Sequence, residues 1–205
     1  MQRFLQIFLI LISLSVFLSC SVTRTYVRAD STEGKSIKAV LESGYSSILY
    51  KASFDISKNH FSGLFFFKQT KDSTIRVVLL SEIGLNFLDM EYKNHEFRVI
   101  NCNELLNKKI LINSIKRDLK LLIDKPQEKK KLKLYKKNNF YIIKQDKHSY
   151  FYNEENLQYK IVQKDVFRNI ELLILSYKDG FPLKINIRNK RIKLNIKLRL
   201  LKITP

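Results

Sequence analysis

Hydrophobic and polar residues alternate with a period of two through most of the chain after residue 45. The clearest case is 191–200, where Ile and Leu occupy every second position and Arg, Lys or Asn lie between them. Successive side chains of a β-strand point to opposite faces, so this pattern predicts half-buried strands. The predicted strands are 48–56, 61–69, 74–80, 85–92, 96–101, 140–144, 150–152, 159–166, 170–177 and 191–200.

Short polar turns separate these strands and indicate how they connect. The dipeptide Asp179-Gly180 is typical of a two-residue hairpin turn, and 70–73 and 93–95 are also short and polar. At Leu200-Leu201 the alternation slips by one residue, which predicts a β-bulge. Such turns favour an antiparallel meander and leave no room for βαβ crossovers.

Three segments depart from this alternation. Apolar residues recur at helical spacing over 103–123, which predicts one helix or two short ones, ending before Asp124-Lys-Pro126. A second short helix is predicted over 36–43, with Ser36 as its cap and Gly44 as its stop. The charged run 129–137 predicts a solvated strand or loop.

About ten strands in one twisted sheet tend to curl. We therefore predict a mainly β fold, a single strongly curved antiparallel sheet that forms a half-barrel with helices covering its concave face. Segments 64–67, 77–80 and 172–175 are apolar at every position, so both of their faces are hydrophobic. Two interpretations stay open, an ordinary core or a cavity lined for an acyl chain.

The first twenty residues have the pattern of an export signal. Arg3 precedes an apolar run over 4–18, which is shorter than a membrane span, and the run ends at Ser19-Cys20. This arrangement indicates a bacterial lipoprotein signal, with a lipid attached to Cys20. The alternatives are an uncleaved anchor and a cleaved signal in which Cys20 has no role. We predict a signal peptide over 1–19, a lipidated tether over 20–35 and one domain over 36–205.

The charge balance narrows the class of partner. The chain has 205 residues, with 38 Lys and Arg against 19 Asp and Glu, a formal net charge of +19. A chain with this positive charge favours anionic partners. Because an exported protein leaves the cytoplasm, nucleic acid is not expected to be one of them. The three histidines lack metal-binding spacing, and neither a CxxC nor a GxSxG motif occurs. We predict no catalytic residues, no metal and no cofactor.

Several short motifs resemble those of the outer-membrane lipoprotein receptor family, the LolB-like lipoproteins. They are 65–70 (FFFKQT), 76–80 (RVVLL), Ile83-Gly84, 88–91 (LDME) and 191–194 (RIKL). The chain departs from the family where Glu82 replaces the turn proline and Phe67 replaces a strand tryptophan.

The resemblance implies a half-barrel whose hydrophobic cavity receives the acyl chains of other lipoproteins from a periplasmic carrier. It implies lipidation at Cys20 and a membrane-insertion loop at Ile83 and Gly84. The expected cavity lining is Phe65, Phe67, Val78, Leu80, Phe87, Ile196 and Leu198.

The predicted function is therefore that of a monomeric, lipid-anchored protein on the periplasmic side of the outer membrane. It would bind acyl chains and help to insert lipoproteins into that membrane. Two alternatives are a structural or assembly lipoprotein with a filled core and an enzyme acting on lipid or cell-wall substrates.

Overall fold

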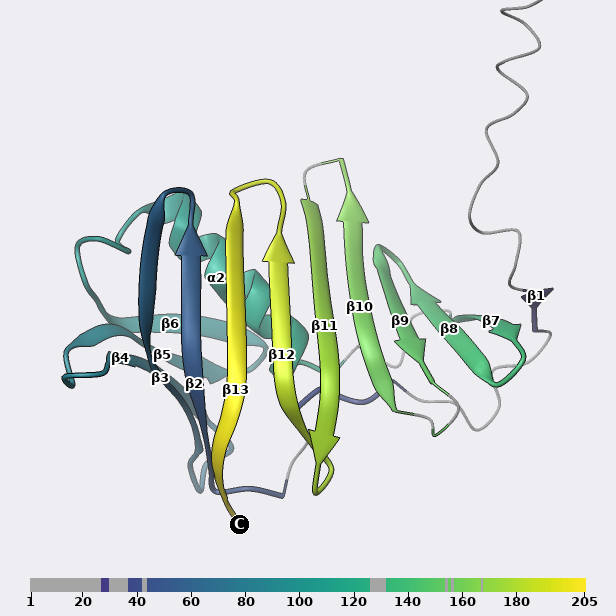
Figure 1. The fold of residues 1–205 in the computed structure, drawn as a ribbon, viewed down its shortest axis with the longest axis horizontal. Helices are drawn as coiled ribbons and strands as arrows, with labels where there is room; N and C mark the ends of the chain where they lie inside the picture. The colour runs from purple at the N-terminus through teal and green to yellow at the C-terminus, as the bar shows by residue number, and fades with distance from the viewer. Residues whose placement is uncertain are drawn as a thin grey trace, which may run out of the picture.

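The computed structural model describes residues 27–29, 37–41, 44–125, 132–153, 155, 157–166 and 168–205. Within these ranges the chain forms one antiparallel sheet of 13 strands, which does not close on itself, and one helix, α2 (Figure 1). The predicted class, mainly β with a single antiparallel sheet, is confirmed. No helix in the described part of the chain is long and apolar enough to cross a membrane.

Ten of the strands overlap the ten predicted ones, whereas the strands at 27–28 and 181–189 are not among those predicted. The helix α2 spans Lys109–Ile123. The strands are β1 Val27–Arg28, β2 Ser47–Ile56, β3 Asn59–Gln69, β4 Ile75–Ser81, β5 Asn86–Lys93, β6 Glu96–Cys102, β7 Lys133–Lys137, β8 Phe140–Gln145, β9 His148–Tyr152, β10 Gln158–Asp165, β11 Arg168–Lys178, β12 Phe181–Asn189 and β13 Leu194–Thr204.

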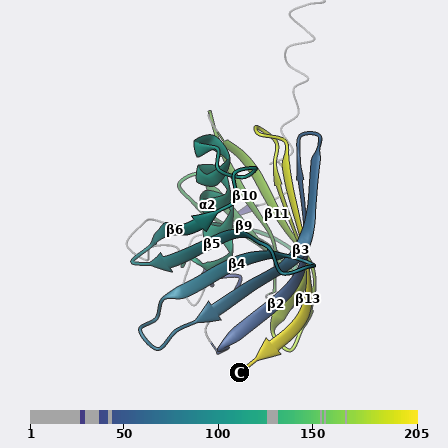
Figure 2. The same ribbon diagram turned by 90° about the vertical axis from the view of Figure 1, so that its left-hand side faces the viewer.

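Two meanders make up the sheet. Strands β2 to β6 form the first and β7 to β13 the second, and they join where β13 pairs with β2. The last strand therefore lies in the middle of the sheet, and β1 and β6 are its edges. Figure 2 shows the strongly twisted sheet from its side, with α2 against one of its two faces. We name this the inner face and the opposite one the outer face.

The inner face carries the hydrophobic core. Tyr50, Phe54, Phe65 and Phe67 are at most 1% exposed. Their rings pack edge to face, with centroids 4.9 Å apart for Phe65 and Phe67 and 5.7 Å apart for Phe54 and Phe65. The buried side of α2 joins the same cluster through Leu111, Ile115, Leu119, Leu122 and Ile123.

The turn and the bulge that the sequence predicts are present in the structure. Asp179 and Gly180 have φ angles of 51° and 78°, which suit the tight hairpin between β11 and β12. The register of β13 on β2 shifts between Leu200 and Lys202, so the predicted bulge is confirmed. Strand β7, in the charged run, pairs with both β1 and β8.

The predicted short helix over 36–43 is wrong for the residues described there. Residues 37–41 are not helical, and the Leu41 amide donates to the Leu122 carbonyl at 2.8 Å. Val40 and Leu41 are buried in the main cluster. The segment thus gains hydrogen bonding and burial from α2, and these contacts override its weak helical pattern.

The other helix starts later than its apolar spacing suggests. Residues 104–106 form turns, and the Asn103 side chain accepts a hydrogen bond from the Leu105 amide at 3.0 Å. Asparagine side chains compete in this way with helical hydrogen bonds. Part of the predicted tether over 20–35 is also folded, because Val27 and Arg28 pair with β7.

Candidate functional site

Five of the seven expected cavity-lining residues lie on the core side of the sheet. Phe65, Phe67, Ile196 and Leu198 are at most 2% exposed. Phe87 is half-buried and packs against Phe61, with ring centroids 5.7 Å apart. Since their neighbours are other core side chains and the buried face of α2, the protein itself fills this part of the inner face.

Val78 and Leu80 lie on the outer face, which corrects their assignment to the cavity. In the register of β3 and β4, Phe65 lies opposite Leu79, whereas Val78 lies opposite Phe66. Leu80 follows the same phase, and both side chains are only half-buried. A strand that is apolar at every position does not reveal which half of its residues points inward.

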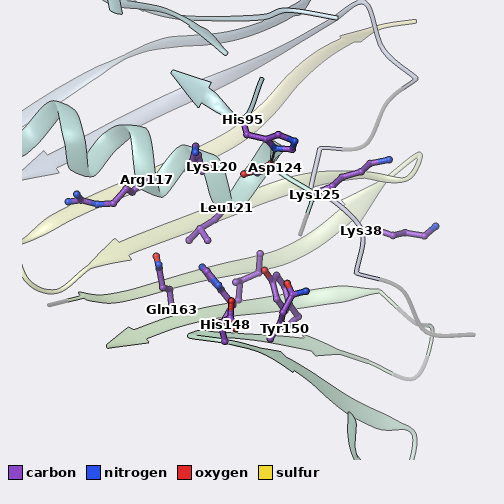
Figure 3. A pocket seen from close by; sticks show the side chains of 13 residues that line it. Lys38, His95, Arg117, Lys120, Leu121, Asp124, Lys125, His148, Tyr150 and Gln163 are labelled. Carbon is purple, nitrogen blue, oxygen red and sulfur yellow. Dashed lines mark hydrogen bonds and ion pairs between the residues drawn. The ribbon is translucent and has the colours of Figure 1, made fainter. Parts of the chain in front are cut away.

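A hollow of about 470 Å³ lies beside the second half of α2, and we name it the α2 pocket. Figure 3 shows His148, Tyr150 and Gln163 of β9 and β10 directed toward the last turns of the helix. Leu121 and Ile161 give the pocket an apolar wall. The remaining lining residues are Lys38, His95, Arg117, Lys120, Asp124, Lys125, Gln145 and Asp146.

The α2 pocket is positively charged. Four of its side chains are Lys or Arg and two are Asp, an excess of two positive charges with histidine neutral. His95 Nδ1 lies 2.6 Å from Asp124 Oδ1, so one carboxylate is already engaged. Arg117 donates from Nη2 to Ser114 Oγ at 2.9 Å, and its buried Nε has no hydrogen-bond partner. An unpaired buried N–H donor is well suited to an incoming anion.

The floor of the pocket is buried but not fully apolar. Gln145, Tyr150 and Gln163 are between 5 and 6% exposed. Burial is the main cause that raises the pKa of Tyr150, with Asp124 and Asp146 adding to it, so its hydroxyl stays protonated at neutral pH. The floor therefore offers neutral polar groups beneath a cationic rim.

A buried polar contact fixes α2 to the sheet close by. Asn189 Nδ2 of β12 donates to the two carboxylate oxygens of Asp118 at 3.2 and 3.3 Å. Asp118 is fully buried, and this desolvation raises its pKa to about 7, against the opposing effects of Asn189 and Arg117. The contact therefore changes its charge state near neutral pH.

Ile83, Gly84 and Cys102, which the sequence also singled out, do not line this pocket. Ile83 is 82% exposed in the turn between β4 and β5, and Gly84 has a φ angle of 83° there. Cys20 lies outside the described residues. Cys102 is a half-buried free thiol whose pKa is raised by burial.

The described residues contain no group of three His, Cys, Asp or Glu side chains placed to hold a metal ion. His60 and His95 each contact an aspartate, Asp55 and Asp124, at 2.6 Å. What the α2 pocket offers is a place where an anionic group and an apolar group can bind side by side. The basic side of α2 was visible in the sequence, but the glutamines and tyrosines that face it were not.

Comparison with known proteins gives weak likenesses. No family profile matches the chain. No curated protein matches it either. Among solved structures, a LolA superfamily protein from Nitrosomonas europaea matches with a TM-score of 0.42 and 7% identity, over 77% of this chain and 84% of the other.

A DUF1329 family protein from Desulfovibrio piger matches with a TM-score of 0.40 and 10% identity, over 79% of this chain and 86% of the other. Scores at this level do not assign a family or an activity.

Proposed function

We propose that this chain is a lipid-anchored, periplasm-facing protein of the outer membrane that binds acyl chains and helps to insert lipoproteins there. One observation carries the proposal. The cationic α2 pocket borders the apolar inner face, since Ile161 and Tyr150 belong both to the pocket and to the core cluster. An anionic or polar head group in the pocket would thus place its acyl chain next to the core.

The helix α2 is the element that an acyl chain would replace. Its start has no side-chain cap at Lys108 and no acidic residue in the first turn, so the helix depends on packing for its stability. Its polar attachments include the Leu41–Leu122 backbone bond and the Asp118–Asn189 contact. We infer that α2 moves as a lid over the inner face.

The free energy needed to expose the buried side of α2 is similar in size to the free energy gained by burying an acyl chain. Exposing the five buried aliphatic side chains of α2 costs roughly 8–15 kcal/mol. Burying ten to fourteen methylenes of an acyl chain returns roughly 8–11 kcal/mol at about 0.8 kcal/mol each. Near balance is what a protein needs in order to accept a lipid and release it again.

The membrane part of the proposal depends on Cys20 and on the turn at Ile83. An acylated Cys20 would hold the domain at the bilayer, and the exposed Ile83 would insert beside it. A periplasmic carrier would deliver the lipoprotein, and the mechanism makes and breaks no covalent bond. The chain would therefore act by binding and would not be an enzyme.

The second candidate is a structural or assembly lipoprotein of the envelope. The filled inner face favours it, because Phe65, Phe67 and the α2 side chains already occupy the expected cavity. This candidate predicts that α2 stays in place and that fatty acids do not bind to the inner face.

A disulfide lock separates the two candidates. Asp118→Cys with Asn189→Cys links α2 to β12 through a short bifunctional reagent that forms a disulfide with each thiol, in a Cys20→Ser, Cys102→Ser background without other thiols. The reagent is needed because only the ends of the Asp118 and Asn189 side chains are in contact, and a direct disulfide requires Cβ atoms about 4 Å apart. We expect saturable binding of a fluorescent fatty acid when the pair is reduced and loss of binding when it is cross-linked. The matched control is Ser53→Cys with Ser62→Cys, a directly opposed pair on the outer face of β2 and β3.

The outcomes are distinct for each candidate. Binding that is lost in the cross-linked lock but kept in the cross-linked control supports entry beneath α2. Equal binding in both cross-linked proteins places the lipid elsewhere, and absence of saturable binding in all of them favours the structural candidate.

A further inference from the structure

Three basic side chains stand in one row across the outer face of the sheet. Lys184 on β12 lies directly opposite Arg199 on β13, and Arg199 lies directly opposite Lys51 on β2. All three are exposed. The chain neighbours of these residues, Ala52, Ile185 and Leu198, are buried in the core cluster on the α2 side, so the alternation of the strands places the row on the outer face. In Figure 1 the three strands lie in front of α2. We name Lys184, Arg199 and Lys51 the basic row.

The basic row costs stability in the isolated protein. Directly opposed residues of antiparallel strands have Cβ atoms about 4.5–5.5 Å apart, and like charges at this spacing destabilise the sheet. For Lys51 this repulsion is offset by an ion pair, because its Nζ lies 3.2 Å from Glu82 Oε1. Lys184 and Arg199 have no acidic partner among the residues that the structure describes. An external anion is the natural source of the missing negative charge.

A hollow of about 570 Å³ surrounds the row. His60 and Lys197 add further polar groups to its lining, and Leu175 on β11 adds an apolar one. Leu175 is 64% exposed, and the turn that carries Glu82 continues into the exposed Ile83. Cationic side chains next to exposed aliphatic ones are typical of surfaces that bind phospholipid head groups and contact their chains.

We propose that the basic row is a docking site for the phosphate groups of an anionic phospholipid bilayer. The outer face would lie against the membrane, and the lipid phosphates would neutralise Lys184, Arg199 and Lys51. This site is separate from the α2 pocket on the other face, so it does not depend on acyl-chain binding. It would give the anchored domain a fixed orientation.

Vesicle binding tests the docking site on the full-length chain with Cys20→Ser. The test variant is Lys184→Gln with Arg199→Gln, and the matched control is Lys71→Gln with Lys178→Gln, two exposed lysines outside the row. The vesicles are phosphatidylcholine alone or with about one third phosphatidylglycerol, and sedimentation gives the bound fraction. Because every protein keeps the same N-terminal segment, its contribution to binding cancels.

Affinity for the anionic vesicles should fall about 10- to 30-fold in the test variant and clearly less in the control, because charges near the membrane outweigh distant ones. Binding to neutral vesicles should not change. The test variant should also melt at a higher temperature, because the like-charge contact is gone.

Three outcomes would overturn the proposal. One is an equal loss of affinity in the test and control variants, which would indicate net charge alone. Another is an equal loss on neutral vesicles. The third is unchanged vesicle binding with weaker binding of inorganic phosphate or polyglutamate, which would indicate a soluble anion or an acidic protein as the ligand.

Discussion

Two parts of the inner face differ in the polarity of their inward-pointing side chains, although both consist of strands with alternating inward and outward residues. On β2 and β3 the inward positions are aromatic or aliphatic, and Phe54, Phe65 and Phe67 are at most 1% exposed. On β8 and β10 the inward positions include Gln145 and Gln163, which border the α2 pocket. We name these the apolar part and the polar part.

The difference shows where the interior is open. Apolar inward residues gain from contact with one another and with α2, so the apolar part is filled. The polar part instead places amide side chains beside the hollow of about 470 Å³, where a polar ligand can reach them. The boundary between the two parts is therefore where we expect an amphiphilic ligand to enter.

The largest expected effect comes from emptying the apolar part. Phe65→Ala should lower the free energy of unfolding by about 3–5 kcal/mol, because a fully buried ring leaves a cavity among packed neighbours. Gln163→Ala in the polar part should lower it by about 1 kcal/mol or less. Urea denaturation of the two variants measures both values, and similar losses would contradict the division into two parts.

The next effect concerns Asp118, close to the boundary. Its folded pKa of about 7 lies above the ordinary value of 3.8, so the folded state binds more protons than the unfolded state between these values. Its contribution to stability is complete below pH 4 and decreases up to pH 7, by a few kcal/mol at most.

Asp118→Asn should remove this part of the pH dependence of unfolding. Denaturation midpoints of both proteins from pH 4 to pH 8 test it. Parallel curves for the two proteins would show that Asp118 titrates normally.

The smallest effect concerns the charge of the α2 pocket. Arg117→Gln with Lys120→Gln should weaken binding of a fatty acid about tenfold and leave binding of its methyl ester unchanged, because only the carboxylate uses these cations. Lys116→Gln is the control, since Lys116 does not line the pocket. Equal weakening of the acid and the ester would mean that the pocket does not hold the head group.

Much of the fold follows from the sequence because its signals are local. Alternation marked the strands, Asp179-Gly180 marked a hairpin, and the slip at Leu200-Leu201 marked a bulge. The pairing of β13 with β2 has no local signal, because it joins segments about 140 residues apart in sequence. The same limit applies to β1, whose partner β7 is more than 100 residues away.

The candidate site was less accessible to sequence reasoning. The sequence does not show which residues of β4 point inward, because Val77, Val78, Leu79 and Leu80 are all apolar. In the structure Val78 and Leu80 point outward. The α2 pocket collects residues from five separate segments of the chain, none of which forms a motif. The basic row depends on the register of three strands, and the sequence shows only that each strand carries basic residues.

The movement of α2 is the central claim, and a distance measurement tests it most directly. Spin labels at Asn113→Cys on α2 and Arg188→Cys on β12, in the Cys20→Ser, Cys102→Ser background, report the separation of helix and sheet. We predict that saturating fatty acid shifts this distance to longer values. An unchanged distance at full occupancy of the lipid would contradict entry beneath α2.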